Sequence, residues 1–402
     1  MKYGLKMLNK MCFAALAALA VSFPAVADSV PSGFSRPLEW RIGAEVSPSF
    51  VPGTNTFIRG ENPIDRRIRG SFAADLKAGF SFSSDSREGQ LYHGAYQGLG
   101  VGMNTFFTHS LLGTPTSLYV YQGAPIVHFG DRLWLGYEWQ FGAAFGWKGH
   151  SYDDDEYINM PVSTRVTAHM GLSLKLHYSL TDRWQLSMGL AARHFSNGNT
   201  SLPNAGVNTL GANIGVTYII NPQPEVAKRS AELEDEADRG RWMYDIVAFG
   251  AWRRRIVTVG EPPESDLCPG KFGVAGLQFS PLRRLNRYVA VGPALDVQWD
   301  ESAGLAPYWI EGSYDENIKF ERPPFGKQLS VGVSAHAELT MPIFSINAGL
   351  GYDMVKPKGE KRFYQSLALK AFLTRSIFLN VGYRLGNFKD PQNLMLGVGV
   401  RL

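Results

Sequence analysis

The chain of 402 residues has little charge and little cysteine: charged residues make up 19% of it, and only 2 cysteines are present. Low charge together with 45% hydrophobic and 12% aromatic residues argues against a disordered chain. Beyond the N-terminus there is no uninterrupted apolar run of about 18 residues, so no transmembrane helix is predicted. The net charge is only +4, and without the first 27 residues 37 basic side chains stand against 36 acidic ones. We therefore expect no nucleic-acid partner.

The N-terminus has the three parts of a secretory signal peptide, in the usual order. The basic part consists of three lysines, Lys2, Lys6 and Lys10. An apolar segment follows at residues 11–21, and residues 25–27 (Ala-Val-Ala) form a cleavage site. Cleavage there removes Cys12 and leaves Cys268 alone, so no intrachain disulfide is expected in the mature protein. The sequence therefore predicts export from a bacterial cytoplasm.

The rest of the sequence is dominated by an alternation of apolar and other residues with a period of two. The clearest examples are residues 166–177, 182–196 and 394–402. Segments of about ten residues with one apolar face, joined by very short turns, are typical of transmembrane barrel strands, whose apolar face points outward. A soluble sandwich would show the same alternation with its apolar face inward. The length of the strands and the export signal favour an antiparallel β-barrel in the bacterial outer membrane.

Sixteen strands are predicted, in two groups of eight. The first group lies at about 38–52, 70–83, 92–108, 116–129, 132–147, 163–179, 182–196 and 207–221, and the second at about 241–259, 270–281, 287–299, 327–340, 342–354, 361–374, 376–386 and 391–402. The halves also resemble each other weakly, as in LSLKL at 172–176 and LALKA at 367–371. We predict four parts: a signal peptide (1–27), an eight-stranded barrel (28–221), a charged linker (222–240) and a second barrel unit (241–402). One fused barrel of sixteen strands is the alternative.

Three polar residues fall on the predicted outward faces of two neighbouring strands. His194 and Ser196 continue the apolar face of strand 182–196, and Asn208 begins the apolar face of the next strand, beside His194. Polar side chains on a lipid-facing surface are costly and call for a function. A serine, a histidine and an amide at one place have the composition of a catalytic triad. Taken alone, however, H-x-S is a short and common string.

The surrounding sequence, HFSNGNTSLPNAGVN at 194–208, resembles the signature of the PagL-type lipid A 3-O-deacylases. That signature reads H-x-S-N followed, at fixed spacing, by P-N-x-G-x-E. The matching residues are His194, Ser196, Asn197, Pro203, Asn204 and Gly206. Members of the family are eight-stranded outer-membrane barrels. The resemblance covers about residues 38–221, is strongest over 193–221 and does not extend directly to the second half.

The resemblance implies an esterase that acts on lipid A of lipopolysaccharide in the outer leaflet, without a cofactor or a metal. It implies that Ser196 attacks the acyl ester, that His194 is the general base, and that the Asn204 side chain and the backbone N–H of Asn199 form the oxyanion hole. Two positions depart from the pattern, because Asn208 replaces a glutamate and Asn199 replaces a glycine. The second departure matters less, since any residue other than proline supplies a backbone N–H.

The amide at position 208 can accept a hydrogen bond from His194, but it offers no negative charge to the imidazolium. In a serine protease the change from carboxylate to amide lowers turnover about 10⁴-fold. Three interpretations stay open: the enzyme is slow, an acid from a loop substitutes, or this copy is no longer catalytic. The candidate loop acids are Asp153, Asp154, Asp155 and Glu156. The rival function is a non-enzymatic barrel, structural or porin-like.

A group of arginines follows the first predicted strand, namely Arg59, Arg66, Arg67 and Arg69. In a closed eight-stranded barrel the first strand neighbours the eighth, so this group is expected near Asn208. Arginines there suit the phosphates of lipid A. An ordinary solvated loop could have the same composition, so both interpretations stay open. Inside the barrel we expect Lys175, together with His169 and His177. The second half has no H-x-S, and we predict that it lacks the chemistry.

Overall fold

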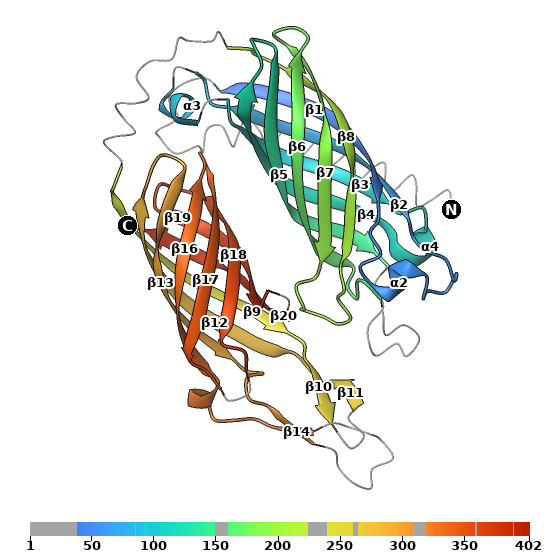
Figure 1. Cartoon of the computed structure of the whole chain (residues 1–402), viewed down its shortest axis with the longest axis vertical. Coiled ribbons are helices and arrows are strands. Elements are labelled where there is room, and N and C mark those ends of the chain that lie inside the picture. The colour runs from blue at the N-terminus through green and yellow to red at the C-terminus, as the bar shows by residue number, and fades with distance from the viewer. Residues whose placement is uncertain are drawn as a thin grey trace. The chain divides into compact units, whose positions relative to one another are not determined.

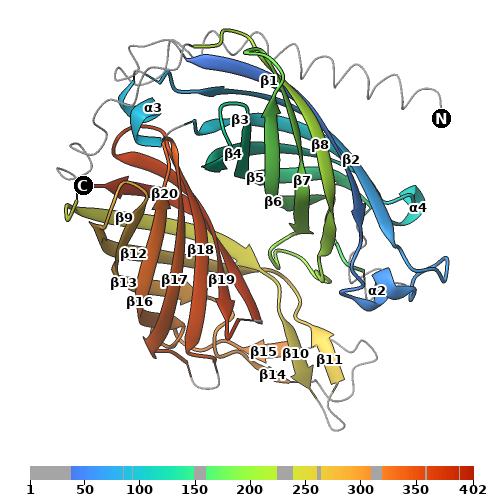
Figure 2. The same ribbon diagram turned by 45° about the horizontal axis from the view of Figure 1, so that its top comes forward.

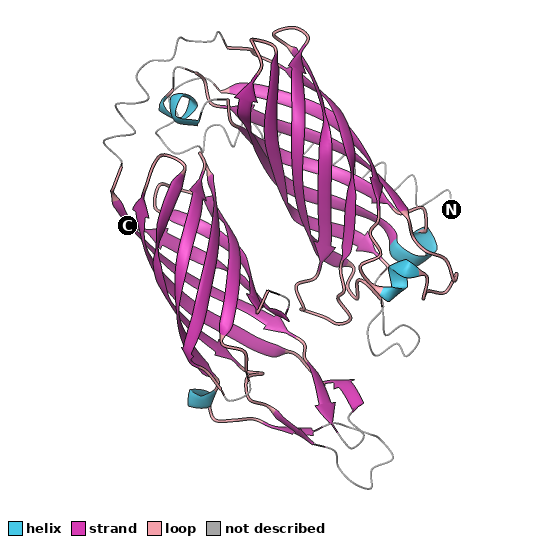
Figure 3. Cartoon of the chain, in the orientation of Figure 1, coloured by secondary structure: helices cyan, strands magenta, loops and turns pink. Residues whose placement is uncertain are grey.

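Two closed eight-stranded antiparallel barrels make up most of the protein, as a computed structural model shows (Figure 1). The structure describes residues 38–84, 86–92, 94–148, 160–223, 239–259, 264–308, 319–357, 360–388 and 390–402. Nearly all of its regular secondary structure is strand (Figure 3). The predicted signal peptide and most of the predicted linker lie outside these residues. Among the helices that are described, none is long and apolar enough to cross a membrane.

The first barrel closes in sequence order, and β1 pairs with both β2 and β8. Its strands are β1 (Glu39–Phe50), β2 (Gly70–Ser81), β3 (Tyr96–Thr105), β4 (Gly113–His128), β5 (Leu133–Trp147), β6 (Val166–Ser179), β7 (Trp184–Ser196) and β8 (Val207–Ile219). Three short helices lie in the connections after β1, β2 and β3: α2 (Thr56–Arg59), α3 (Arg87–Tyr92) and α4 (His109–Leu112). The eight predicted strands are confirmed, whereas the helices were not predicted.

The second barrel closes through the pairing of its last strand with its first (Figure 2). Its strands are β9 (Trp242–Arg253), β12 (Phe272–Arg284), β13 (Val289–Asp300), β16 (Leu329–Thr340), β17 (Phe344–Val355), β18 (Phe363–Phe372), β19 (Ile377–Gly386) and β20 (Asp390–Arg401). Two small hairpins and one 3-10 helix project from it: β10 (Ile256–Val259) with β11 (Glu264–Leu267), β14 (Ala306–Tyr308) with β15 (Lys319–Glu321), and η1 (Phe325–Lys327).

Two predictions about these strands are corrected by the pairing. The alternative of one fused barrel of sixteen strands is wrong, because β8 returns to β1 and β20 returns to β9. The strand predicted at 241–259 is interrupted at residues 254 and 255, where the chain leaves the barrel and enters the β10–β11 hairpin. Three consecutive arginines, Arg253, Arg254 and Arg255, mark the break, and apolar β-branched residues resume directly after them in β10.

The apolar side chains of the strands point outward, as predicted. On β7, Leu190 is 69% exposed, whereas Arg193 is only 6% exposed. The same alternation runs along β1, β6, β8 and β9. An apolar outer surface around a polar interior is the arrangement of an outer-membrane barrel and the reverse of a soluble sandwich.

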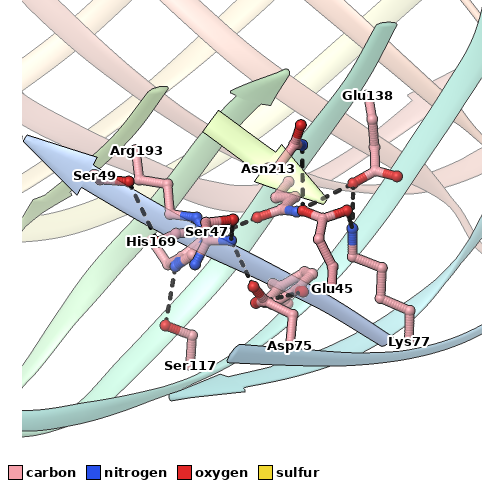
Figure 4. Close-up of polar contacts among 12 residues, drawn as sticks. Glu45, Ser47, Ser49, Asp75, Lys77, Ser117, Glu138, His169, Arg193 and Asn213 are labelled. Atoms are coloured by element: carbon pink, nitrogen blue, oxygen red, sulfur yellow. Dashed lines mark hydrogen bonds and ion pairs between the residues drawn. The ribbon is translucent and has the colours of Figure 1, made fainter. Parts of the chain in front are cut away.

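Paired charges fill the interior of the first barrel (Figure 4). Lys175 Nζ lies 2.6 Å from Glu45 and 2.8 Å from Glu138, and Lys77 Nζ lies 3.0 and 2.6 Å from the same two carboxylates. A buried charge is costly unless it is paired, and here each carboxylate contacts two ammonium groups. The predicted interior position of Lys175 is confirmed, as are those of His169 and His177.

The second barrel is filled in the same way. Lys370 Nζ lies 2.6 Å from Asp245 and 2.5 Å from Glu338, and the Arg401 guanidinium contacts both carboxylates. An eight-stranded barrel has an interior that its own side chains can fill, while sixteen strands leave an aqueous channel. Neither described interior is therefore built as a wide pore.

We expect the purified protein to give no large, steady openings in planar bilayers, because both barrel interiors are occupied by paired charged side chains. Single-channel conductance checks this, with a sixteen-stranded porin in the same bilayers as the positive control. Steady porin-like openings would contradict two closed and filled barrels.

Candidate active site

Strands β7 and β8 hold His194 and Asn208 opposite each other on the outward face. His194 Nδ1 lies 2.7 Å from Asn208 Oδ1, so the predicted pairing is present. An amide oxygen only accepts, and the shared proton therefore belongs to His194 Nδ1. In this tautomer the other ring nitrogen, Nε2, carries a lone pair and is free to act as a base.

The segment after β1 supports this pair from the other side. The Asn208 amide donates to Thr54 Oγ1 at 3.4 Å. The next residue, Asn55, is buried; its Oδ1 caps α2 by accepting from the Ile58 N–H, and its amide donates to the Gly206 carbonyl at 3.1 Å. Because β1 pairs with β8, residues 151 positions apart in the sequence fix one side of the site.

Gly206 lies directly against the His194 ring. Its φ is +73°, and a Cβ added to it would lie 2.9 Å from His194 Cε1. Both the backbone conformation and the close approach favour glycine. Any larger residue at this position would push the imidazole away from its place beside Asn208.

Ser196 ends β7 on the same outward face as His194. It lies opposite Ala168 of β6 and is partly exposed. Between the two, Phe195 points inward and is fully buried, with its ring 5.2 Å from that of Trp147. Within the described residues no hydrogen bond joins the Ser196 hydroxyl to the His194 ring. The structure thus brings His194 and Asn208 together and places Ser196 two residues along the strand, about 7 Å away in Cα position.

The predicted oxyanion residues lie in the turn that follows Ser196. The Asn204 Oδ1 accepts from the backbone N–H of Asn197 at 2.9 Å, and Asn204 Nδ2 donates to Asn199 Oδ1 at 3.1 Å. Gly198 and Asn199 both have a φ of +63°, which turns the chain sharply at this point. The Asn204 side chain is therefore held beside the peptide bond that follows the candidate nucleophile.

An open groove of 520 Å³ begins at His194 and runs along the outward surface. In register, the small Ala192 lies between Leu172 of β6 and Leu210 of β8, which leaves a depression in the apolar surface. The lining residues are Pro52, Thr54, Met170, Gly171, Leu172, Ala192, Arg193, His194, Asn208, Thr209 and Leu210. Its shape and apolar walls suit a hydrocarbon chain.

The predicted arginines are all exposed, and two of them reach the edge of this groove. A Cβ built on Gly53, which lies between two groove residues, would be 2.9 Å from Arg59 Cγ and 3.7 Å from Arg67 Nη2. The Arg67 guanidinium also lies 5.8 Å from the centre of the Phe50 ring. Arg66 and Arg69 are exposed on the same segment and are not among the residues that line the groove.

The acidic loop predicted as an alternative source of the third group lies outside the described residues. The part of the chain that is described holds no group of three or more His, Cys, Asp or Glu side chains suited to a metal ion.

The second barrel contains a serine, a histidine and an amide, but in its interior. His336 Nε2 lies 2.9 Å from Ser334 Oγ, and His336 Nδ1 lies 2.5 Å from Asn347 Oδ1. Ser334 donates its hydroxyl proton to Asp296 at 2.6 Å, so that proton is not directed at the imidazole. All of these groups are buried. We interpret them as polar filling of the barrel, which is consistent with the prediction that the second half lacks the chemistry.

Two protein-family models match the chain: "Lipid A 3-O-deacylase (PagL)" over residues 73–217, and "Acyloxyacyl hydrolase, C-terminal domain" over residues 242–402. Among solved structures, the chain is similar to the outer membrane enzyme PagL, with 15% identity over 44% of this chain and 97% of that one and a TM-score of 0.27. It is also similar to CdiB from Acinetobacter baumannii, with 12% identity over 90% of this chain and 60% of that one and a TM-score of 0.18. No curated protein matches the chain.

At a pH where the imidazole is neutral, we expect His194 to carry its proton on Nδ1, because Asn208 Oδ1 can only accept. Nitrogen-15 chemical shifts of histidine-labelled protein in detergent micelles distinguish the two tautomers, and His194→Gln assigns the signal. Asn208→Ala should give a mixture of tautomers. A proton on Nε2 in the unaltered protein would contradict the hydrogen bond described here.

Proposed function

Because residues 73–217 of this chain belong to the PagL family of lipid A 3-O-deacylases, we propose that its first barrel is a serine esterase. The family match, together with closed barrels whose outer surface is apolar, supports an outer-membrane lipid A deacylase. The finer proposal is that Ser196 and His194 hydrolyse an ester-linked acyl chain of lipid A in the outer leaflet.

The observation that carries the proposal is the hydrogen bond between His194 Nδ1 and Asn208 Oδ1 on the lipid-facing surface. It holds the ring in the tautomer whose free Nε2 can take a proton from Ser196, two residues along the same face. In resting enzymes the bond between nucleophile and base is often long and tightens when substrate binds. The separation of Ser196 from His194 therefore agrees with the proposed roles.

The reaction proceeds as acyl transfer to the serine. Ser196 Oγ attacks the ester carbonyl carbon while His194 Nε2 takes the hydroxyl proton. The resulting oxyanion accepts hydrogen bonds from Asn204 Nδ2 and the backbone N–H of Asn199. The carbon–oxygen bond to the sugar then breaks, and the sugar oxygen receives the proton from His194. Water, activated by His194, hydrolyses the acyl-serine and releases a fatty acid.

The position of the site at the membrane surface suits a substrate that does not leave the membrane. The groove beside His194 offers an apolar trough for the acyl chain, between Leu172 and Leu210. Arg67 lies near the groove edge, where it can bind a phosphate of the lipid A head group, with Arg66 and Arg69 on the same exposed segment.

A second candidate function, a non-enzymatic barrel, is favoured by one observation. Asn208 holds the His194 ring but supplies no charge to stabilise the imidazolium that forms during the reaction. A site without this charge is less suited to catalysis than one with a carboxylate, as expected for a barrel that has lost its activity.

Ser196→Ala and His194→Ala should each abolish release of fatty acid from lipid A by the purified protein in mixed micelles. Both residues point outward, so neither change should disturb the barrel interior. Ser201→Ala in the same loop is the matched control and should keep full activity. Heat-modifiable migration on gels verifies folding. Activity near that of the unaltered protein in either site variant would exclude the proposed nucleophile and base.

Asn208→Glu should raise the deacylation rate by about 10- to 100-fold, because a carboxylate stabilises the imidazolium and roughly 1.4 kcal/mol of barrier corresponds to a factor of ten. Asn208→Ala should lower the rate, because the ring loses its acceptor. Turnover of the purified variants measures both effects.

Substitutions in the acidic loop, such as Asp154→Asn and Glu156→Gln, should have little effect if Asn208 orients the ring itself. A silent Asn208→Ala combined with severe losses in the loop variants would assign the third group to the loop instead.

A further inference from the structure

The turn after Ser196 contains a hydrogen bond that takes no part in the proposed mechanism. Asn204 Nδ2, the proposed oxyanion donor, already donates to the side-chain oxygen of Asn199 at 3.1 Å. Asn199 contributes to the proposed oxyanion hole only through its backbone. The Asn199 side chain is therefore a polar group at the proposed oxyanion hole that the mechanism does not use.

The Asn204 amide does not need Asn199 to hold its position. Its Oδ1 accepts from the Asn197 N–H at 2.9 Å, which fixes the carbonyl end beside the peptide bond after Ser196. Asn197 is itself buried and donates to Ser163 Oγ at 3.1 Å. Because an amide group is planar, fixing Oδ1 also restricts where Nδ2 can point.

The backbone directs the Asn199 side chain back toward Asn204. Asn199 has a φ of +63°, a left-handed conformation that asparagine tolerates better than most residues and that glycine adopts freely. A glycine at this position would keep the backbone N–H and the turn. It would have no oxygen to place against Asn204.

The geometry points to Asn199 as an internal occupant of the oxyanion site. We propose that Asn199 Oδ1 lies where the substrate's carbonyl oxygen must bind and that it is displaced when the oxyanion forms. The inference rests on the proposed function, in which Asn204 is the oxyanion donor. Asn199 is thus a positioning residue that slows the reaction by keeping the donor engaged in the resting state.

The expected size of the effect follows from the strength of a neutral hydrogen bond. Such a bond in a partly exposed site changes an equilibrium by about 3- to 10-fold. An oxyanion hole accelerates a reaction because its donors are oriented in advance and need no rearrangement. Asn204 contacts the substrate oxygen most strongly in the transition state. The hydrogen bond to Asn199 should therefore lower kcat more than it changes KM.

Asn199→Gly should therefore raise kcat about 3- to 10-fold with little change in KM for lipid A in mixed micelles. Asn199→Asp, which has the same shape but a charged oxygen, should lower kcat at least 10-fold. The carboxylate holds Asn204 Nδ2 more strongly and repels the developing oxyanion. Glycine is favoured at the observed φ, and heat-modifiable migration verifies that each variant folds.

A double-mutant cycle tests whether the effect passes through Asn204. The rate of Ser196 labelling by a lipid-like fluorophosphonate provides a readout besides turnover, because the phosphoryl oxygen takes the place of the oxyanion. Asn199→Gly should speed labelling of Ser196 when Asn204 is present. It should have no effect on labelling when Asn204 is replaced by alanine. An equal gain in both backgrounds would overturn the proposal.

The outcomes separate this inference from the function on which it rests. If the unaltered protein shows Ser196-dependent activity and Asn199→Gly leaves kcat unchanged or lowers it, Asn199 supports the donor and the inference is wrong. If neither protein shows any Ser196-dependent hydrolysis or labelling, the proposed function fails, and the inference fails with it.

Discussion

The site depends on one constraint, the alternation of side chains between the two faces of a closed barrel. On β7, Arg193 and Phe195 must point inward, where Arg193 pairs with Asp75 at 2.6 Å and Phe195 is fully buried. His194 and Ser196 must then point outward, toward the membrane. A slip of one residue in strand register would move the arginine to the lipid face and the candidate nucleophile into the interior. Interior packing therefore determines where the chemistry can occur.

The same scaffold occurs twice, but the site only once in the described residues. In both barrels a buried lysine on the sixth strand, Lys175 or Lys370, pairs with an acid on the first strand, and these lysines lie at matching places in the weak sequence repeat. At the end of the seventh strand the first barrel has the outward-facing His194 and Ser196, while the seventh strand of the second barrel ends in Arg384, Leu385 and Gly386, with neither histidine nor serine. A shared fold does not imply a shared function, and we propose that the differences at this strand end restrict the chemistry to the first barrel.

The sequence predicted the strands and their faces well, because alternation is a local signal. It also predicted the pairing of His194 with Asn208, since neighbouring strands joined by one loop have few possible registers. It could not predict the contact of Asn55 with Gly206 or the ion pairs around Lys175, because these join residues far apart in the chain. The bond between Asn204 and Asn199 was also missed, since it depends on the left-handed conformation of Asn199. The short helices and hairpins lack a periodic pattern long enough to detect.

We propose that an outward-facing serine and histidine on the first barrel cleave lipid A within the membrane. Mass spectrometry of lipid A from cells with and without the protein shows whether this cleavage occurs. We expect lipid A from cells with the protein to lack the mass of one ester-linked acyl chain. Identical spectra from the two strains, with the protein folded in the outer membrane, would contradict it.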